Sequence, residues 1–293
     1  MLTEAQIAKF NQIILSFWAD YLNSHPDYID EAGIAELTAD SSFTAEEVYP
    51  MVIAALMGLS VDENRLHREI YEAYFPDMIH PLSAEDYRCD PYYRAVQFPN
   101  VREGKWELRT LSYKPYEAFV VSDPHTRTDR RIIPQIGYFE ERFDYPCVLE
   151  GGREWMLITP NEINTMAPHV EAAFGKVLTY GLGLGYFAYM TARKEEVDSV
   201  TVVERDADVI ALFEGYVRPR LGGAGEKITV VQADAFDFAA TEMAKGGYNY
   251  VFTDLWRDPS DGVALYHRMQ ALEHLSPGSE FGYWIEDTLR LYE

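Results

Sequence analysis

The sequence predicts an α/β protein whose C-terminal part forms a doubly wound, parallel sheet. After residue 175, five short apolar runs alternate with helical or polar sequence: KVLTYG, SVTVVE, KITVVQAD, YNYVFTD and EFGYWIE. Parallel strands that helices cover on both faces have this pattern. The preceding chain is first helical and then rich in aromatic and β-branched residues. We therefore expect a helical N-terminal segment over residues 1–94, a small antiparallel β-rich segment over 95–160 and the sheet domain over 161–293.

The composition and net charge of the chain limit the kinds of partner and site that we expect. The 293 residues are 47% hydrophobic, enough for a full core, and their formal net charge is -23. Such a charge repels phosphate backbones and anionic lipid, so we expect neither a nucleic-acid nor a membrane partner, and a neutral or cationic small substrate instead. Cys89 and Cys147 belong to no cluster with metal-ligand spacing, so no metal site is predicted. Without a basic leader or a long apolar run, the expected location is the cytoplasm.

The N-terminal segment has the spacing of amphipathic helices. In TEAQIAKFNQIILSFWADYL the apolar residues recur at steps of three and four. Thr3 with Gln6, and Thr44 with Glu47, predict capping boxes at two helix starts. We expect these helices to close over the substrate, to form a homodimer interface, or to do both.

The β-rich segment ends in a hairpin and a helix. Gly151 and Gly152 stand between two short apolar runs, which predicts a hairpin turn. Thr159 is the expected N-cap of the next helix, with Glu162 completing a capping box.

A glycine-rich loop follows the first strand of the sheet domain. Gly181, Gly183 and Gly185 lie between this strand and a helix, where bare backbone can approach a ligand closely. The dinucleotide fingerprint needs a small residue at its sixth position, but Tyr186 stands there. A phosphate-binding P-loop would need a lysine, which is also missing. The loop therefore argues against NAD, FAD and nucleoside triphosphates.

Acidic residues end the next three strands. Glu204 lies about 20 residues beyond the loop, where a carboxylate can accept hydrogen bonds from both hydroxyls of a ribose. Asp234 could accept from the exocyclic amine of adenine while the Ala235 backbone meets the ring. Asp254 ends the fourth strand beside the first, at the switch point where the reacting end of a ligand is expected.

These motifs resemble those of class I S-adenosylmethionine-dependent methyltransferases. GLGLG, the Glu of VVERD, the Asp of ADAF and the Asp of VFTD occur in the family's order over residues 176–287. The resemblance implies a Rossmann-like domain that binds S-adenosylmethionine. It assigns the following residues to the cofactor: Gly181, Gly183, Gly185, Tyr186, Glu204, Arg205, Asp234, Ala235 and Asp254.

Within that family the sequence is similar to the spermidine-synthase-like branch. VTVVERDADVI and VQADAFDF resemble its strands. TDLWRDP loosely resembles its Asp-x-x-Asp-Pro stretch, with one more residue between the two acids, which suggests Asp254 and Asp258 as catalytic residues. However, Leu184 stands where aminopropyltransferases carry an Asp. Methyl transfer to a small molecule is therefore the first hypothesis. Aminopropyl transfer from decarboxylated S-adenosylmethionine and a non-catalytic nucleoside-binding role are the alternatives.

Overall fold

The chain forms two compact units that each contain two stretches of sequence. The computed structural model describes residues 2–39, 42–97 and 99–292. Unit 1 consists of Met1–Glu85 and Ser112–Asp144, and unit 2 of Asp86–Leu111 and Tyr145–Glu293. The expected boundaries after residues 94 and 160 do not coincide with this division. The strands of the β-rich segment are shared between the two units because they pair with different partners, which local periodicity does not specify.

Unit 1 combines helices with two small sheets. Its helices are α1 (Glu4–Ser24), α2 (Glu31–Ala39), α3 (Ala45–Leu56), α4 (Arg65–Tyr74) and η1 (Phe75–Asp77), and α5 (Ala84–Arg88) begins at its border. Its strands are β1 (Ile79–Leu82), β4 (Phe119–Val120), β5 (His125–Thr126), β6 (Ile132–Ile133) and β7 (Ile136–Phe139), in the sheets β1-β7-β4 and β5-β6. Strand β1 lies inside the segment expected to be helical. It forms because β7, distant in sequence, pairs with it in parallel.

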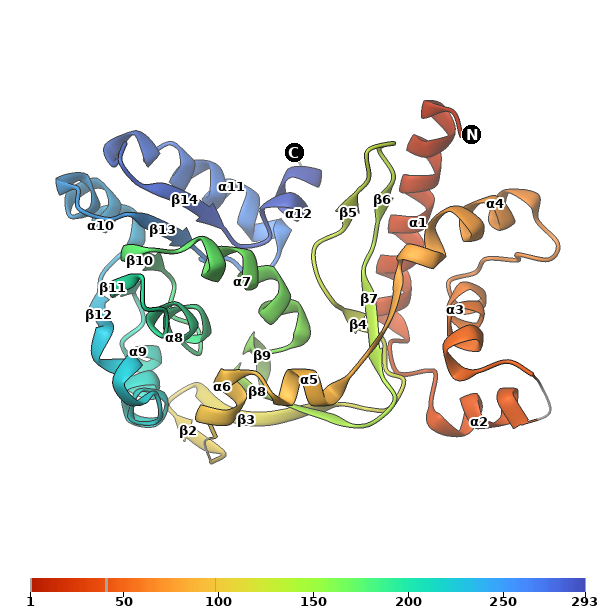
Figure 1. Cartoon of the computed structure of the whole chain (residues 1–293), viewed down its shortest axis with the longest axis horizontal. Coiled ribbons are helices and arrows are strands. Elements are labelled where there is room, and N and C mark those ends of the chain that lie inside the picture. The colour runs from red at the N-terminus through yellow and green to blue at the C-terminus, as the bar shows by residue number, and fades with distance from the viewer. Residues whose placement is uncertain (1, 40–41, 98, 293) are drawn as a thin grey trace. The chain divides into compact units, whose positions relative to one another are not determined.

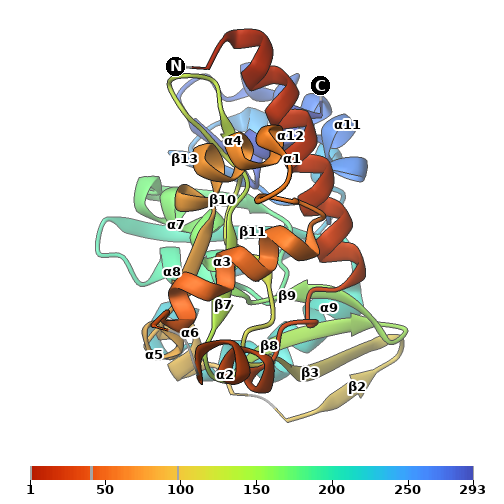
Figure 2. The ribbon, with the colours of Figure 1, turned by 90° about the vertical axis from the view of Figure 1, so that its right-hand side faces the viewer.

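The core of unit 1 joins α1 and α3 to strand β7 (Figure 2). Both predicted capping boxes are confirmed, at Thr3 and at Thr44. Tyr49 of α3 stacks on Tyr138 of β7 with ring centroids 3.8 Å apart, and its hydroxyl donates to the carbonyl of Tyr116. These contacts give the unit a hydrophobic core of its own.

Unit 2 contains a parallel and an antiparallel sheet. The antiparallel sheet, in the order β2-β3-β8-β9, consists of β2 (Val101–Glu103), β3 (Trp106–Tyr113), β8 (Phe143–Glu150) and β9 (Arg153–Leu157). The parallel sheet consists of β10 (Gly175–Tyr180), β11 (Val197–Glu204), β12 (Ile228–Gln232), β13 (Tyr250–Thr253) and β14 (Glu280–Tyr283). The helices are α6 (Pro91–Ala95), α7 (Pro160–Ala172), α8 (Tyr186–Ala192), α9 (Ala207–Leu212), α10 (Ala235–Thr241), α11 (Pro259–Gln270) and α12 (Glu286–Leu291), and five short 3-10 or π segments, η2 (Phe213–Val217), η3 (Arg218–Arg220), η4 (Gly222–Lys227), η5 (Met243–Lys245) and η6 (Glu273–Leu275), connect them.

The parallel sheet has the predicted Rossmann-like, doubly wound topology. All five predicted runs are strands, in the order β12-β11-β10-β13-β14. The order reverses between β10 and β13, as in doubly wound folds. Helices α8 and α9 lie on one face of the sheet, and α10 and α11 on the other (Figure 1). The central strands β10 and β13 are buried along most of their length because both faces are covered.

The strand register determines where the functional residues meet. Tyr180 of β10 pairs with Val203 of β11 and with Thr253 of β13. The residues that follow these three, namely Gly181, Glu204 and Asp254, therefore emerge together at the carboxyl edge of the sheet. The predicted hairpin is also confirmed, because Glu150 of β8 pairs with Arg153 of β9 across the two glycines.

Candidate functional site

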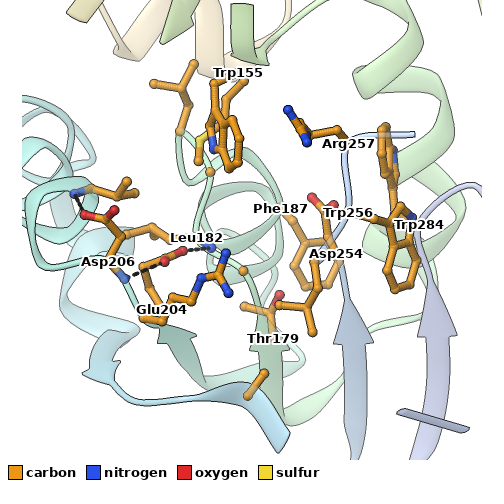
Figure 3. A pocket seen from close by; sticks show the side chains of 18 of the residues that line it. Trp155, Thr179, Leu182, Phe187, Glu204, Asp206, Asp254, Trp256, Arg257 and Trp284 are labelled. Carbon is orange, nitrogen blue, oxygen red and sulfur yellow. Dashed lines mark hydrogen bonds between the residues drawn. The ribbon is translucent and has the colours of Figure 1, made fainter. Parts of the chain in front are cut away.

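A pocket of about 380 Å³ lies at the carboxyl edge of the parallel sheet. Strands β10 to β13 form its floor, and residues of β9, α7 and the start of β3 complete its walls, so every lining residue belongs to unit 2. Figure 3 shows two groups of side chains facing each other across it. We call the group of Leu182, Glu204 and Asp206 the Glu204 end, and the group of Phe187, Asp254, Trp256 and Trp284 the Asp254 end.

The glycine loop borders the pocket, but two of its glycines are needed by the chain itself. All three have positive φ. A Cβ at Gly181 would overlap the carbonyl oxygen of Asp254, and one at Gly185 would overlap the ring of Phe213. At Gly183 the nearest atom to such a Cβ is the sulfur of Met156, 3.8 Å away. Gly181 and Gly183 line the pocket and Gly185 does not. Of the three glycines, Gly183 is therefore the one at which a ligand can approach the backbone closely. Gly181 and Gly185 are needed so that the loop can pack against Asp254 and Phe213.

Glu204 is fixed beside this loop by backbone donors. Its carboxylate accepts from the N–H of Leu182 at 3.2 Å and, through the other oxygen, from the N–H of Asp206 at 2.8 Å. Each oxygen keeps a second lone pair for a ligand. The side chain is thus held as an oriented acceptor at its end of the pocket.

The predicted adenine-binding residues lie next along the same edge. Asp234 is exposed and caps α10, because its Oδ1 accepts from the N–H groups of Phe236 at 2.9 Å and Asp237 at 3.1 Å. It also lines the pocket, as do Ala235 and the exposed Arg205. The structure therefore brings Glu204, Arg205, Asp234 and Ala235 together along one wall, as the motif order predicts.

The Asp254 end holds carboxyl groups in a different environment. Burial and, to a smaller extent, the negative charge of Glu204 together raise the pKa of Asp254 to about 7. Glu162, in the first turn of α7, also lines the pocket, and burial, reinforced by the charge of Asp254, raises its pKa well above the ordinary value. Charged carboxylates are costly in such a site, so this pair holds protons more readily than exposed acids do.

The position of Glu162 corrects one expectation. Thr159 is the N-cap of α7, but it makes no side-chain capping bond, so the predicted capping box is absent. Thr159 is buried, and Glu162 lines the pocket instead. A signal for this existed in the sequence. The helix that leads into the first strand of a doubly wound sheet starts at the carboxyl edge, which brings its first turn to the ligand.

The remaining two predicted residues have clear structural roles. The Tyr186 ring lines the pocket, and its hydroxyl donates to Asp90 at 3.0 Å. Asp258 is exposed and caps α11 in a capping box with Asp261, accepting from the N–H of Ser260 at 2.7 Å. It does not line the pocket. The structure thus brings Asp254, but not Asp258, into the site.

Several pocket residues had no signal in the sequence. Trp155 of β9 lies under the guanidinium of Arg257, with 5.0 Å from Cζ to the ring centroid. Trp284 donates its indole N–H to Thr165 of α7 at 2.9 Å. These side chains come from segments distant from one another in sequence, so only packing shows that they line one pocket with Trp256.

Two other kinds of feature, a metal site and a membrane-spanning helix, are absent among the described residues. Across residues 2–39, 42–97 and 99–292, His, Cys, Asp and Glu side chains form no group that could hold a metal ion. In the same residues, no helix has the length and apolar character needed to cross a membrane.

Comparisons with known proteins give likenesses of fold only. No protein-family model matches the chain, and no curated protein is similar to it. The methyltransferase domain of bacterial CtHen1-C resembles 39% of this chain over 57% of its own length, with 16% identity and a TM-score of 0.29. Spermidine synthase from Thermotoga maritima resembles 43% of this chain over 48% of its own length, with 18% identity and a TM-score of 0.31. The matched part spans about half of each of these structures.

Proposed function

We propose that unit 2 binds S-adenosylmethionine and that the protein transfers its methyl group to a small-molecule acceptor. The observation that carries this proposal is one pocket in which Glu204, fixed beside the glycine loop, faces Asp254 at the end of the neighbouring strand. The pocket lies at the switch point of a doubly wound sheet, which is where such sheets bind nucleotides.

The residues present fit this cofactor. The pocket volume lies in the range of small-molecule sites. Ribose hydroxyls can donate to Glu204, whose backbone bonds orient it without using all its lone pairs. Asp234 caps α10 through Oδ1, which leaves Oδ2 for the adenine amine. Ala235, as the first residue of α10, has an N–H that no helical carbonyl accepts.

The chain's part in the reaction is mainly alignment. When bound, S-adenosylmethionine supplies a methyl group that is already activated on a sulfonium. Holding an acceptor in line with it can contribute about 7–11 kcal/mol. Asp254 is placed to orient the acceptor, and its pKa of about 7 suits a group that takes a proton near neutral pH. The net charge of -23 favours a small acceptor over a nucleic acid.

Aminopropyl transfer is a second candidate, which one observation favours. Asp254 and Glu162 are both acidic and share one pocket. A cofactor without a carboxylate would avoid repulsion from them.

Calorimetry with four ligands tests these proposals. We expect S-adenosylmethionine and S-adenosylhomocysteine to bind the full chain with similar affinity, and NAD not to bind. At least tenfold tighter binding of decarboxylated S-adenosylmethionine would favour aminopropyl transfer. If none of the adenosyl compounds binds, the proposed function is wrong. If they bind but no metabolite pool yields S-adenosylhomocysteine, a binding protein is the better description.

A further inference from the structure

Glu162 gives the Asp254 end a second carboxyl group, which the proposed methyl transfer does not use. It enters from the first turn of α7, whereas Asp254 follows β13, and both line the pocket. Within the described part of the chain, neither carboxyl has a hydrogen-bond donor or a basic side chain paired with it. Two acidic side chains from separate elements therefore share one cavity, and among the described residues no donor or basic group balances their charge.

The basic side chains that line the pocket are engaged elsewhere or lie at the other end. Lys105 pairs with Glu150 at 2.6 Å and with Asp206 at 3.8 Å. Arg257 pairs with Asp261 at 3.5 Å and lies over the ring of Trp155. Arg205 follows Glu204 at the end of β11. We therefore expect a positively charged group of a ligand to balance the negative charge of Glu162 and Asp254.

Aromatic side chains beside the carboxyl pair suit a cation as well. Phe187, Trp256 and Trp284 line the same end of the pocket (Figure 3). Phe187 stacks on Phe252 with centroids 4.2 Å apart, and Trp284 is fixed to α7 through Thr165. The indole N–H of Trp256 is buried and, among the described residues, has no hydrogen-bond partner. Aromatic faces next to carboxylates are a common setting for ammonium groups.

We propose that Glu162 and Asp254 together bind the ammonium group of the acceptor and take its proton, so that the substrate is an amine. This inference rests on the proposed transferase function. One N–H bond of R–NH3+ breaks, its proton goes to a carboxylate oxygen, and the amine keeps the electron pair. That pair forms the N–CH3 bond while the S–CH3 bond breaks and its electrons stay on sulfur. The product is R–NH2+–CH3, and the carboxyl returns its proton to water. The raised pKa of both acids supports their role as proton acceptors.

The test measures amine binding to the full chain without relying on turnover. The probes are n-butylamine, 1,4-diaminobutane and benzylamine, with 1-butanol and benzyl alcohol as neutral counterparts. Each is titrated calorimetrically with and without saturating S-adenosylhomocysteine. We expect at least one amine to bind the saturated protein at least tenfold more tightly than its alcohol. Glu162→Gln and Asp254→Asn should each weaken that binding at least tenfold, and thermal melts confirm that both variants are folded.

Two further variants control for charge elsewhere on α7 and for a loss of folding. Glu171→Gln changes an exposed acid on the same helix and should leave amine binding unchanged. If Glu162→Gln does not fold, Glu162→Asp keeps the charge on a shorter side chain and should still weaken binding. The inference is overturned if no amine binds, if alcohols bind equally, or if Glu162→Gln binds as the original protein does. It is also overturned if S-adenosylhomocysteine blocks the amine, because the pair would then hold the cofactor's own amino group. Failure of S-adenosylhomocysteine to bind at all would instead reject the proposed function.

Discussion

The two ends of the pocket hold carboxyl groups in two different environments, one with hydrogen-bond donors and one without. At the Glu204 end, Glu204 accepts two backbone N–H bonds, and nearby Asp234 accepts two more. At the Asp254 end, Asp254 and Glu162 accept no such bonds from the described residues, and burial raises the pKa of both. Hydrogen bonds to the charged form keep a carboxylate ionised and oriented, whereas burial without them favours the protonated form. One pocket therefore contains fixed acceptors for hydroxyl groups and, opposite them, groups able to exchange protons.

Gly181 connects the two ends, and its substitution should have the largest effect. A Cβ there would overlap the Asp254 carbonyl, at a φ of +95° that already disfavours other residues. We expect Gly181→Ala to lower the free energy of unfolding by about 4 kcal/mol. Gly183→Ala, with only a left-handed φ to accommodate, should cost about 1–2 kcal/mol. Urea unfolding measures both, and equal losses would contradict the assigned contact.

The protonation of Asp254 should appear in the pH dependence of stability. Its folded pKa of about 7 lies above the ordinary value, so the folded chain binds more protons than the unfolded chain between about pH 4 and pH 7. The free energy of unfolding should therefore fall as the pH rises through this range. Asp254→Asn should remove this contribution. We expect the variant to be more stable than the original protein by about 4 kcal/mol near pH 8, and the difference to vanish near pH 4.

Burial also raises the pKa of Glu162, and the charge of Asp254 adds to that rise. Asp254→Asn removes this charge, so it should lower the pKa of Glu162. Urea unfolding of Asp254→Asn and Glu162→Gln over this pH range measures both contributions. If the stability of Asp254→Asn followed the pH as that of the original protein does, Asp254 would not be the group that takes up a proton on folding.

The Glu204 end predicts a loss of cofactor affinity. Glu204→Ala removes an oriented acceptor for ribose and leaves the N–H groups of Leu182 and Asp206 without their partner. We expect the binding of S-adenosylhomocysteine to weaken by about 1–3 kcal/mol. Calorimetry measures it, with the exposed Glu195→Ala as a control. An unchanged dissociation constant would place the ribose elsewhere.

Asp258 should give the smallest effect. Its side chain caps α11, so Asp258→Ala should lower the free energy of unfolding by about 1 kcal/mol. The dissociation constant of S-adenosylhomocysteine should not change. A large loss of turnover in a stably folded Asp258→Ala would restore the catalytic role that the resemblance of this stretch implied.

The sequence by itself determined the parallel sheet and one wall of the pocket. Continuous apolar runs identified the five strands, because a strand that is covered on both faces must be apolar along its length. Parallel register then brings the residues after each run to one edge, so Gly181, Glu204 and Asp254 could be placed near one another without coordinates. Capping boxes and the glycine hairpin were equally readable, since their bonds join residues a few positions apart.

Only the tertiary structure decided which distant segments share a unit and what each acid does. Strands β1 and β7 pair across about fifty residues of intervening chain, and no local pattern names a strand's partner. The role of Glu162 is also not encoded locally. Its position in the helix predicted a capping box, but the packing of α7 brings Glu162 into the pocket that Asp254 also lines. Gly181 and Gly185 likewise owe their identity to Asp254 and Phe213, residues that folding brings against them. Short-range hydrogen bonds and periodicity are encoded locally, whereas burial and charge proximity exist only once the chain has packed.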